Sequence, residues 1–409
     1  MASLLAWVDH DSEARDRTLR ILALFQERES RDELGLGGVR DSFADQLFPG
    51  TSTIQTRLRY MLIVPWVYMR LEEKRIPTSE FAQRADTAER NLIEPLMASD
   101  DLAGVFGRTA GRRVKRLPSS VYWAGLGAWG IRTVPYSQDE YHRRIGEVYR
   151  ARDAAEQKAG ERTRRGDDRE VTELAGQTWH PRIPGPPEGF PDEIDFALTR
   201  EEASFLLDRI HFSHPDSLLS HLARNCEPAD VEAPWLHPDY AGFSPAQKEL
   251  LHHARLFSEV MHGASLVYNI LLAELRKWTD RIDEHRQAFE EWHQGLAHKE
   301  VTDWDLARLW SLTMDHGHTI TARTRAFVES WARMAKDGSL DLADDESARR
   351  TIQVRETSLK RARSRFRNQR ALDQWGGRSG VGRLLYRWPN VSILLEDLYR
   401  GLNEEDGDA

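Results

Sequence analysis

Hydrophobic residues in this chain recur at steps of three and four, the spacing of one face of an α-helix. The longest uninterrupted series consists of Leu250, Ala254, Phe257, Met261, Ala264, Tyr268, Leu271, Leu275 and Trp278. It predicts one long helix that packs along a single stripe, against its own domain or against another copy. A second series from Ile282 to Leu296, after a break near Asp280, predicts a returning antiparallel helix.

Helix-start signals support the same fold class. Three hydroxyl caps are followed three residues later by an acid or amide: Ser137 with Glu140, Thr199 with Glu202, and Ser244 with Gln247. Further helices are expected over residues 13–28, 52–72, 78–96 and 119–129. No run of alternating β-branched residues competes with them. We therefore predict an all-α fold, a multi-helix bundle with long antiparallel helices and few or no strands.

The length of 409 residues exceeds the ~250 to 300 at which a single core stops growing. Between about residues 151 and 191 the sequence changes to a charged stretch and then a proline-rich one, which is typical of a linker. We predict an N-terminal helical domain over residues 1–150, a linker over 151–195, and a C-terminal helical domain over 196–409. The last domain contains a basic segment at residues 349–387.

Composition narrows the class of protein. Hydrophobic residues make up 40% of the chain and it has 13 tryptophans, which favours a folded protein over a disordered one. The single cysteine, Cys226, excludes an internal disulfide and a cysteine-based zinc site, and a reducing cytoplasm fits best. We find no basic region before the apolar N-terminal stretch and no run of ~18 apolar residues. We expect a cytoplasmic protein without a membrane partner.

Charge is distributed unevenly along the chain. The formal net charge is -9, yet residues 349–387 contain twelve arginines and lysines against two acids, Glu356 and Asp373. A basic stripe on an acidic body can bind a polyanion locally while the whole protein stays soluble. The segment is therefore a candidate nucleic-acid interface.

A first candidate site lies around Asp41, Asp45 and the stretch from Leu47 to Arg57. Asp41 and Asp45 are one helical turn apart, which suits a carboxylate that activates water or stabilises a cation. Threonine and serine at a helix start, with Arg57 and Arg59 one turn later, would clamp a backbone phosphate. Alternatively, the hydroxyls only cap the helix and the acids pair with neighbouring arginines.

A second candidate combines cations with aromatic rings. Before Tyr122 and Trp123 lie five basic residues, of which we predict four to bind nucleic acid: Arg112, Arg113, Lys115 and Arg116. Positive charge for phosphates beside flat rings for unstacked bases is what a strand-binding surface requires. Rings on a helix can equally belong to the core, and arginine-rich loops can be merely solvated.

The third candidate is the basic segment itself. On a helix, one stripe would carry Lys360, Arg363, Arg367 and Arg370. Glycines after Trp375 permit close backbone approach to an anion, and three arginines flank them: Arg378, Arg383 and Arg387. No phosphate-loop lysine motif is present, so nucleotide hydrolysis has little support. The alternative is a helix cap, a flexible loop and a solvated face that pairs with the protein's own acids.

Other catalytic patterns are weak. Histidines at positions 211, 214, 252, 253, 316 and 318 lack the spacing of metal hydrolases, so we expect no metal. His285 falls in the apolar stripe, which favours a hydrogen-bonded core residue. No nucleophile elbow is present and Cys226 has no base nearby in sequence, so neither nucleophilic catalysis nor a cofactor is predicted.

Several motifs resemble those of an uncharacterised bacterial family of unknown function. They are Leu47-Phe-Pro-Gly-Thr-Ser-Thr-Ile-Gln-Thr-Arg57, Pro118-Ser-Ser-Val-Tyr-Trp-Ala-Gly125 and Trp375-Gly-Gly-Arg-Ser-Gly380, with the opening Trp7-Val-Asp9 and Tyr386-Arg-Trp388. The resemblance spans nearly the whole chain and brings no catalytic residue with it. It implies a place in phage-defence loci and hence a role on DNA.

These features together predict a DNA-acting antiphage-defence protein. If it is catalytic, hydrolysis of an N-glycosidic bond needs no metal, with Asp41 or Asp45 as the carboxylate, Gln55 reading the extruded base, and Tyr122 or Trp123 stacking on it. The alternative is a non-catalytic helical adaptor that docks on a partner defence protein through the stripe from residue 250 to 278. A nuclease has less support because no Asp…Glu-x-Lys arrangement is visible.

Overall fold

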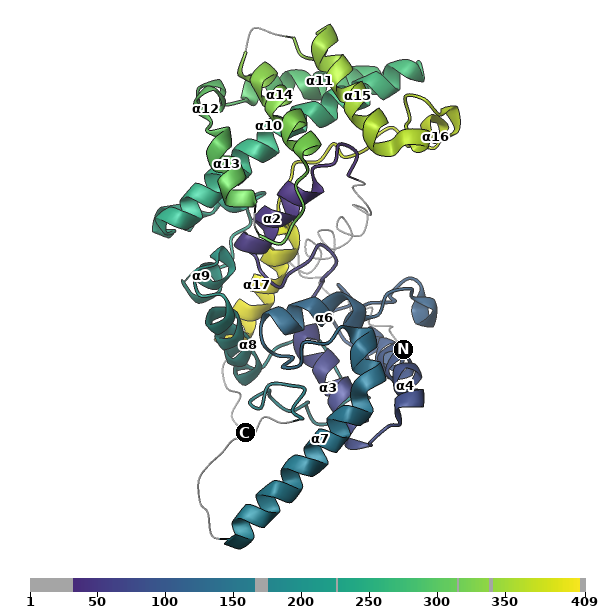
Figure 1. Cartoon of the computed structure of the whole chain (residues 1–409), viewed down its shortest axis with the longest axis vertical. Coiled ribbons are helices and arrows are strands. Elements are labelled where there is room, and N and C mark those ends of the chain that lie inside the picture. The colour runs from purple at the N-terminus through teal and green to yellow at the C-terminus, as the bar shows by residue number, and fades with distance from the viewer. Residues whose placement is uncertain (1–31, 166–175, 226, 315, 338–340, 405–409) are drawn as a thin grey trace, which may run out of the picture. The chain divides into compact units, whose positions relative to one another are not determined.

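The described residues of the computed structural model are mostly helical (Figure 1). The structure describes residues 32–165, 176–225, 227–314, 316–337 and 341–404, with the backbone alone for 158–165. Within these ranges it contains no strand, only an isolated antiparallel bridge between Arg132 and Trp179. The all-α prediction is confirmed. The helix expected over residues 13–28 and Cys226 lie outside the described residues.

The chain divides into two compact units, each assembled from segments far apart in sequence. The described part of unit 1 runs from Phe48 to Asp230 and from Pro389 to residue 404, and that of unit 2 covers residues 32–47 and 231–388. The segment 151–195, predicted as a linker, lies within unit 1, and its first fifteen residues continue a long helix. A change of composition marks a difference in solvent exposure but not which distant segments pack together.

Unit 1 is built largely from helices between residues 60 and 225, to which the last helix of the chain is added. They are α3 (Tyr60–Glu73), α4 (Thr78–Asn91), α5 (Ile93–Ala98), η1 (Gly111–Arg113), α6 (Pro118–Ala128), α7 (Gln138–Arg165), α8 (Arg200–Ser213), α9 (Leu218–Asn225) and α17 (Trp388–Asn403). Its core is aromatic: the ring of Tyr68 lies 5.3 Å from that of Trp123 and 5.7 Å from that of Tyr141.

Unit 2 combines one early helix with the elements from residue 234 onward. They are α2 (Gly37–Leu47), η2 (Pro234–Leu236), η3 (Pro238–Gly242), α10 (Pro245–Leu275), α11 (Thr279–Gly295), α12 (His298–Asp303), α13 (Leu306–Thr313), α14 (Ala322–Lys336), α15 (Glu346–Lys360), η4 (Arg361–Arg363) and α16 (Gln369–Asp373).

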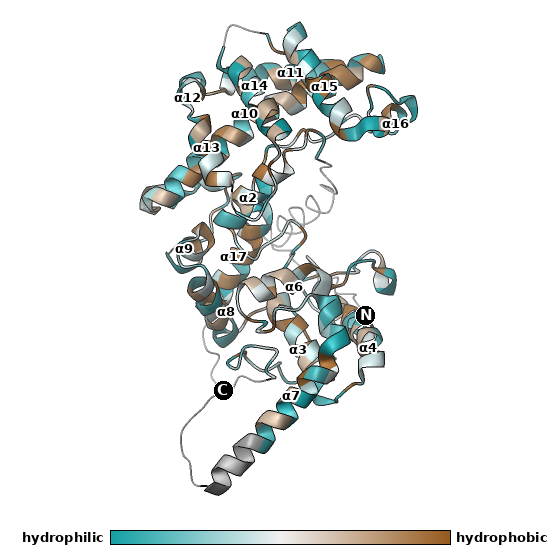
Figure 2. Cartoon of the chain, viewed as in Figure 1, coloured by the Kyte–Doolittle hydropathy of each residue, from teal (hydrophilic) through white to brown (hydrophobic). Residues whose placement is uncertain are grey.

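The central element of unit 2 is α10, which packs against α11, α14 and α15. Its first half mixes hydrophilic and hydrophobic residues, and its second half is mostly hydrophobic (Figure 2). Phe257, Met261 and Tyr268 are fully buried. The α10–α11 hairpin confirms the predicted antiparallel pair: Trp292 of α11 donates to the carbonyl of Glu259 at 2.7 Å. The stripe proposed as a docking face for a partner is thus mostly core of its own unit, which corrects that expectation.

The helix α10 is also the one stretch of the described chain with the length and apolar composition of a membrane-crossing helix. Its best 18-residue window has a mean hydropathy of 1.3, and 83% of that window is buried inside the structure. The core helix of a soluble protein passes the same test, so the expected absence of a membrane partner stays a prediction.

Local signals located most helix starts correctly. Thr199 and Ser244 form capping boxes with Glu202 and Gln247, and the Ser137 hydroxyl bonds the side chain of Glu140 at 2.9 Å. Two expected boundaries are wrong. The helix expected from residue 52 begins at Tyr60, and the one expected over 78–96 breaks at Leu92 into α4 and α5.

Candidate functional site

The loop before α3 is closed by its own side chains. Gln55 accepts a hydrogen bond from the Ser52 amide and donates one to the Gly50 carbonyl, both at 3.1 Å, and is only 1% exposed. Gly50 has a φ of 77°, a conformation that favours glycine, and the indole of Trp129 donates to the Pro49 carbonyl at 2.9 Å. Gln55 is therefore a loop-closing residue, which corrects its assignment as a reader of DNA bases.

The two rings predicted to stack on a base belong to the core of unit 1. The Tyr122 hydroxyl accepts from the amides of Thr56 and Arg57 at 2.9 and 3.0 Å and donates to the Arg57 carbonyl at 2.7 Å. Tyr122 is fully buried and Trp123 is 7% exposed, with its indole donating to the Tyr136 carbonyl at 3.0 Å. Neither offers a free face to a base, so both assignments are corrected.

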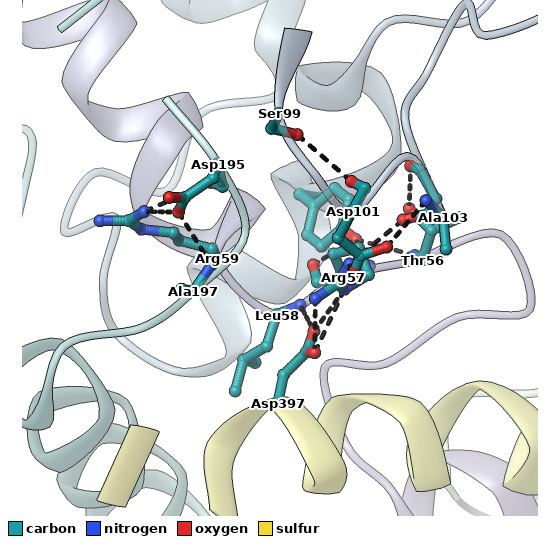
Figure 3. A network of polar contacts seen from close by, with 12 residues as sticks. Thr56, Arg57, Leu58, Arg59, Ser99, Asp101, Ala103, Asp195, Ala197 and Asp397 are labelled. Carbon is teal, nitrogen blue, oxygen red and sulfur yellow. Dashed lines mark hydrogen bonds and ion pairs between the residues drawn. The ribbon is translucent and has the colours of Figure 1, made fainter. Parts of the chain in front are cut away.

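Arg57 lies at the centre of a buried ion network (Figure 3). Its Nε and Nη2 bond the Asp397 carboxylate of α17, both at 2.9 Å, and its Nη1 bonds Asp101 at 2.6 Å. The Leu58 amide also donates to Asp397 at 2.9 Å. Burial disfavours the charge of Arg57, but the carboxylates of Asp397 and Asp101 together outweigh this effect and raise its pKa. The guanidinium therefore stays charged, and each of its three nitrogens already bonds a carboxylate of the protein.

Arg59 is engaged in the same way. Its Nη1 bonds Asp195 at 2.6 Å and its Nη2 bonds Glu202 at 2.8 Å, with only 4% of the residue exposed. A phosphate clamp needs guanidinium groups that face solvent. The assignment of Arg57 and Arg59 as phosphate ligands is therefore corrected: they join the loop before α3 to α17 and to the start of α8.

A cavity of about 700 Å³ opens beside this network. Its lining includes seven carboxylates and two guanidinium groups, namely those of Asp100, Asp101, Asp192, Glu193, Asp195, Asp397, Glu404, Arg57 and Arg400. A negative lining repels phosphate and favours a cationic ligand. No group of three or more potential metal ligands with suitable geometry occurs among the residues that the structure describes. The cavity therefore does not support a DNA-binding site here.

The two candidate catalytic aspartates lie on α2 in unit 2. Asp45 bonds Arg387 through Oδ1 at 2.6 Å and His318 through Oδ2 at 2.7 Å, and Asp41 bonds Arg40 at 2.9 Å. Gln55 and Tyr122 belong to unit 1, so no single site is defined that contains all the residues proposed for glycosidic hydrolysis. The contacts of Asp45 instead fasten three distant segments of unit 2.

The basic loop of unit 1 is exposed to solvent. Arg113, Lys115 and Arg116 face solvent and make no ion pair with the described residues, whereas Arg112 donates to Asn91 at 2.6 Å. Arg90 holds the loop by donating to the Val114 carbonyl at 3.0 Å. This loop keeps its candidate role, but without the neighbouring rings as stacking partners.

About half of the basic segment in unit 2 is neutralised or used internally. The engaged pairs are Arg349 with Glu274, Lys360 with Glu33 at 3.1 Å, Arg365 with Glu33 at 3.0 Å, Arg378 with Glu284, and Arg387 with Asp45. Arg355 donates to the Leu34 carbonyl at 2.8 Å. Lys360, Arg378 and Arg387 therefore lose support as phosphate ligands. The exposed arginines without an ion pair to a described residue are Arg350, Arg361, Arg363, Arg367, Arg370 and Arg383.

Four of these arginines lie on one ten-residue stretch, residues 361–370, which we call the arginine loop. The predicted helical stripe is wrong here, because α15 ends at Lys360 and Arg361 takes a left-handed φ of 52°. Contacts with buried side chains of unit 2 nevertheless hold the loop in place. The buried Glu356 carboxylate accepts from the Ser364 hydroxyl at 2.5 Å and the Arg365 amide at 2.9 Å, and Arg365 donates to the Tyr268 hydroxyl at 2.8 Å.

The glycine-rich turn after Trp375 is fastened to α10 and α11. The Gly377 carbonyl bonds Nε2 of His285 at 2.8 Å, which confirms His285 as a hydrogen-bonded core residue. Asn269 bonds both the carbonyl and the amide of Ser379, at 2.8 and 2.9 Å. The backbone groups expected to receive an anion are thus partly used within unit 2, which corrects that interpretation.

Comparison with known families identifies the family of this chain. Its sequence matches a family model over residues 2–155 and 168–401, nearly the whole length. The chain belongs to DUF6361, a family of unknown function. This confirms the resemblance to an uncharacterised family. No curated protein and no solved structure matches this DUF6361 chain.

The motifs that carry the family resemblance have a structural explanation in this DUF6361 protein. The first two, from Leu47 to Arg57 and from Pro118 to Gly125, meet through the Tyr122 hydroxyl. The third anchors the turn after Trp375 to the α10–α11 hairpin. What the sequence patterns missed is a group of two arginines and a histidine in unit 1, since Arg209, Arg182 and His180 form no recognisable motif.

Proposed function

We propose that this DUF6361 protein binds DNA through the arginine loop of unit 2 and functions in antiphage defence. The observation that carries the proposal is the exposure of Arg361, Arg363, Arg367 and Arg370 on one short loop, with no ion pair to any described residue. Arginine suits phosphate because its planar guanidinium presents several donors at once. The defence context is supported by the family resemblance alone.

The way the loop is held favours binding over mere solvation. Ser364, Arg365 and Phe366 face the body of unit 2, where the Phe366 ring lies 5.8 Å from that of Tyr268. Because these inner residues fix the backbone, the outer arginines lose less conformational entropy when they bind a phosphate. The overall charge of -9 makes the interaction local and sensitive to salt.

Glycosidic hydrolysis receives no support from the geometry. Gln55 and Tyr122 are buried and used by the fold, and Asp45 is bonded to Arg387 and His318. We therefore restrict the proposal to DNA binding and assign no reaction to Asp41 or Asp45. The adaptor alternative loses its proposed surface with the burial of the α10 stripe.

The test compares two quadruple variants that change the net charge equally. One carries R361Q, R363Q, R367Q and R370Q in the arginine loop, and the other carries R84Q, R143Q, R144Q and R150Q on the exposed faces of α4 and α7. Affinity for a fluorescent duplex is measured by anisotropy at low salt. We expect the loop variant to bind at least about tenfold more weakly and the control to stay within about twofold. Equal losses in both variants would refute the proposal.

A further inference from the structure

Arg209 of α8 is a buried arginine without an acidic partner among the described residues. Only 6% of the residue is exposed, its Nε makes no hydrogen bond, and it forms no ion pair with a described residue. Its nearest acid in the sequence, Asp208, is exposed and unpaired with it. Burying a charge without a counter-charge or hydrogen bonds is strongly unfavourable. The other two strongly buried arginines of unit 1, Arg57 and Arg59, are each held by two carboxylates.

His180 and Arg182 belong to a segment that contacts α8 at Phe205, one turn before Arg209. The His180 amide donates to the Ile131 carbonyl at 2.7 Å, which sets this segment beside the residues that follow α6. The His180 ring lies 5.5 Å from that of Phe205, one helical turn before Arg209. The amide of Arg182 donates to Nδ1 of His180 at 3.2 Å, which leaves Nε2 as the N–H donor of the neutral ring.

The positive charges of Arg209 and Arg182 repel each other. Burial lowers the pKa of Arg209, and the charge of Arg182 lowers it further, against a smaller opposite effect of Asp208. Burial also lowers the pKa of His180, and the charges of Arg209 and Arg182 add to that shift. A set of cations and donors whose charge the described protein leaves uncompensated is suited to an external anion.

Gly130 and Phe212 border the Arg209 guanidinium. Gly130 has a φ of 64°, and a Cβ at this residue would lie 3.9 Å from Nη1 of Arg209. On the other side, the Arg209 guanidinium lies 5.0 Å from the ring centre of Phe212, which is 76% exposed. An anion held by Arg209 would therefore sit beside an exposed aromatic ring that can contact the rest of its molecule.

We propose that Arg209, Arg182 and His180 form an oxyanion site in unit 1 that takes the phosphate group of a small molecule. Phosphate fits because a guanidinium can donate two parallel hydrogen bonds to it, while the second arginine and the imidazole reach its remaining oxygens. This site is separate from the arginine loop and does not depend on DNA binding. The phosphate group comes either from inorganic phosphate or from a nucleotide whose base contacts Phe212.

The test measures binding of inorganic phosphate and of adenosine monophosphate by titration calorimetry, with the full chain at constant ionic strength set by chloride. We expect saturable binding to the wild type and a loss of at least about tenfold in R209M and in R182Q, since each removes one charged donor. The matched control R200M removes an exposed arginine from the start of the same helix and should bind like the wild type. Because Arg182 is exposed, R182Q should fold, and it tests the site even if R209M does not fold.

Two arms distinguish the source of the phosphate. Equal affinity for both probes identifies the phosphate group alone as the ligand, whereas tighter binding of adenosine monophosphate that F212A abolishes identifies a nucleotide; both results support the oxyanion site. A second readout is the melting temperature, which phosphate should raise in the wild type and in R200M but not in R209M. The absence of saturable binding to the wild type, or its survival in both R209M and R182Q, would overturn the proposal.

Discussion

At the scale of single residues, buried ion pairs explain the roles of Arg57 and Arg59 in unit 1. Arg57 meets Asp397, which lies 340 positions away in the sequence, and Arg59 meets Glu202. Such pairs cannot be read from local patterns, because nothing in the neighbourhood of Arg57 identifies its partner. This is why Arg57 and Arg59 resembled phosphate ligands in the sequence and are structural ion pairs in the fold.

Replacing one member of the buried pair should destabilise unit 1. In D397N the Arg57 guanidinium keeps Asp101 but loses its two bonds to a full negative charge, so we expect a loss of about 3 kcal/mol in the free energy of unfolding. Urea unfolding followed by tryptophan fluorescence measures it. The control D86N breaks the more exposed pair with Arg90 and should cost less than about 1 kcal/mol. Similar losses in the two variants would contradict the structural role of Asp397.

Glu89 should make stability depend on pH. It is 2% exposed, and burial raises its pKa to about 7, although the hydroxyl and amide of Ser119 oppose this by donating to it at 2.6 and 2.8 Å. Between its unfolded value of 4.5 and about 7, the folded state holds a proton that the unfolded state has released. Stability should therefore fall as pH rises through that window, by up to about 1.4 kcal/mol per pH unit.

The variant E89Q removes this titration. The free energy of unfolding, measured by urea at pH 5 and at pH 7.5, should decrease less in E89Q than in the wild type between these two pH values. The exposed control E80Q should follow the wild type. If E89Q and the wild type lose stability in parallel across this range, Glu89 is not the group responsible.

At the scale of elements, periodic and local signals predicted the central hairpin and several helix starts, but not every boundary. The α10–α11 hairpin follows from its unbroken hydrophobic spacing, and the starts of α8 and α10 follow from their capping residues. The residues 52–59 were misjudged because Tyr122, from another helix, satisfies two of their backbone amides and removes the need for a helix. The arginine loop was misjudged because Glu356, buried at the end of α15, bonds a turn instead of a continuing helix.

The anchor of the arginine loop can be tested without touching an arginine. In E356Q the buried side chain loses one of its two accepting oxygens, so we expect about 1 to 3 kcal/mol less stability, faster amide exchange over residues 361–370, and weaker DNA binding. Hydrogen exchange and anisotropy measure the two effects. The control E346Q makes the same charge change at the exposed start of α15. Unchanged exchange in E356Q would show that the loop is held by other contacts.

At the scale of the whole molecule, the fold class could be predicted from the sequence and the assembly of the units could not. Unit 1 recruits α17 from the end of the chain, and unit 2 recruits α2 from near its beginning. The sign of the charge also differs from one surface to another. The cavity beside Arg57 is lined mainly by acids, whereas the arginine loop carries cations without an ion pair to a described residue. A net charge of -9 therefore says little about what each surface can bind.

The most direct test of the central claim is the salt dependence of DNA binding. On a plot of log affinity against log salt concentration, the slope reports the number of phosphates contacted, at about 0.9 per contact. For the variant with R361Q, R363Q, R367Q and R370Q we predict a slope shallower than that of the wild type by about 3 to 4, with the slope of the α4 and α7 control unchanged. A loop variant whose slope equals that of the wild type would contradict DNA binding by the arginine loop.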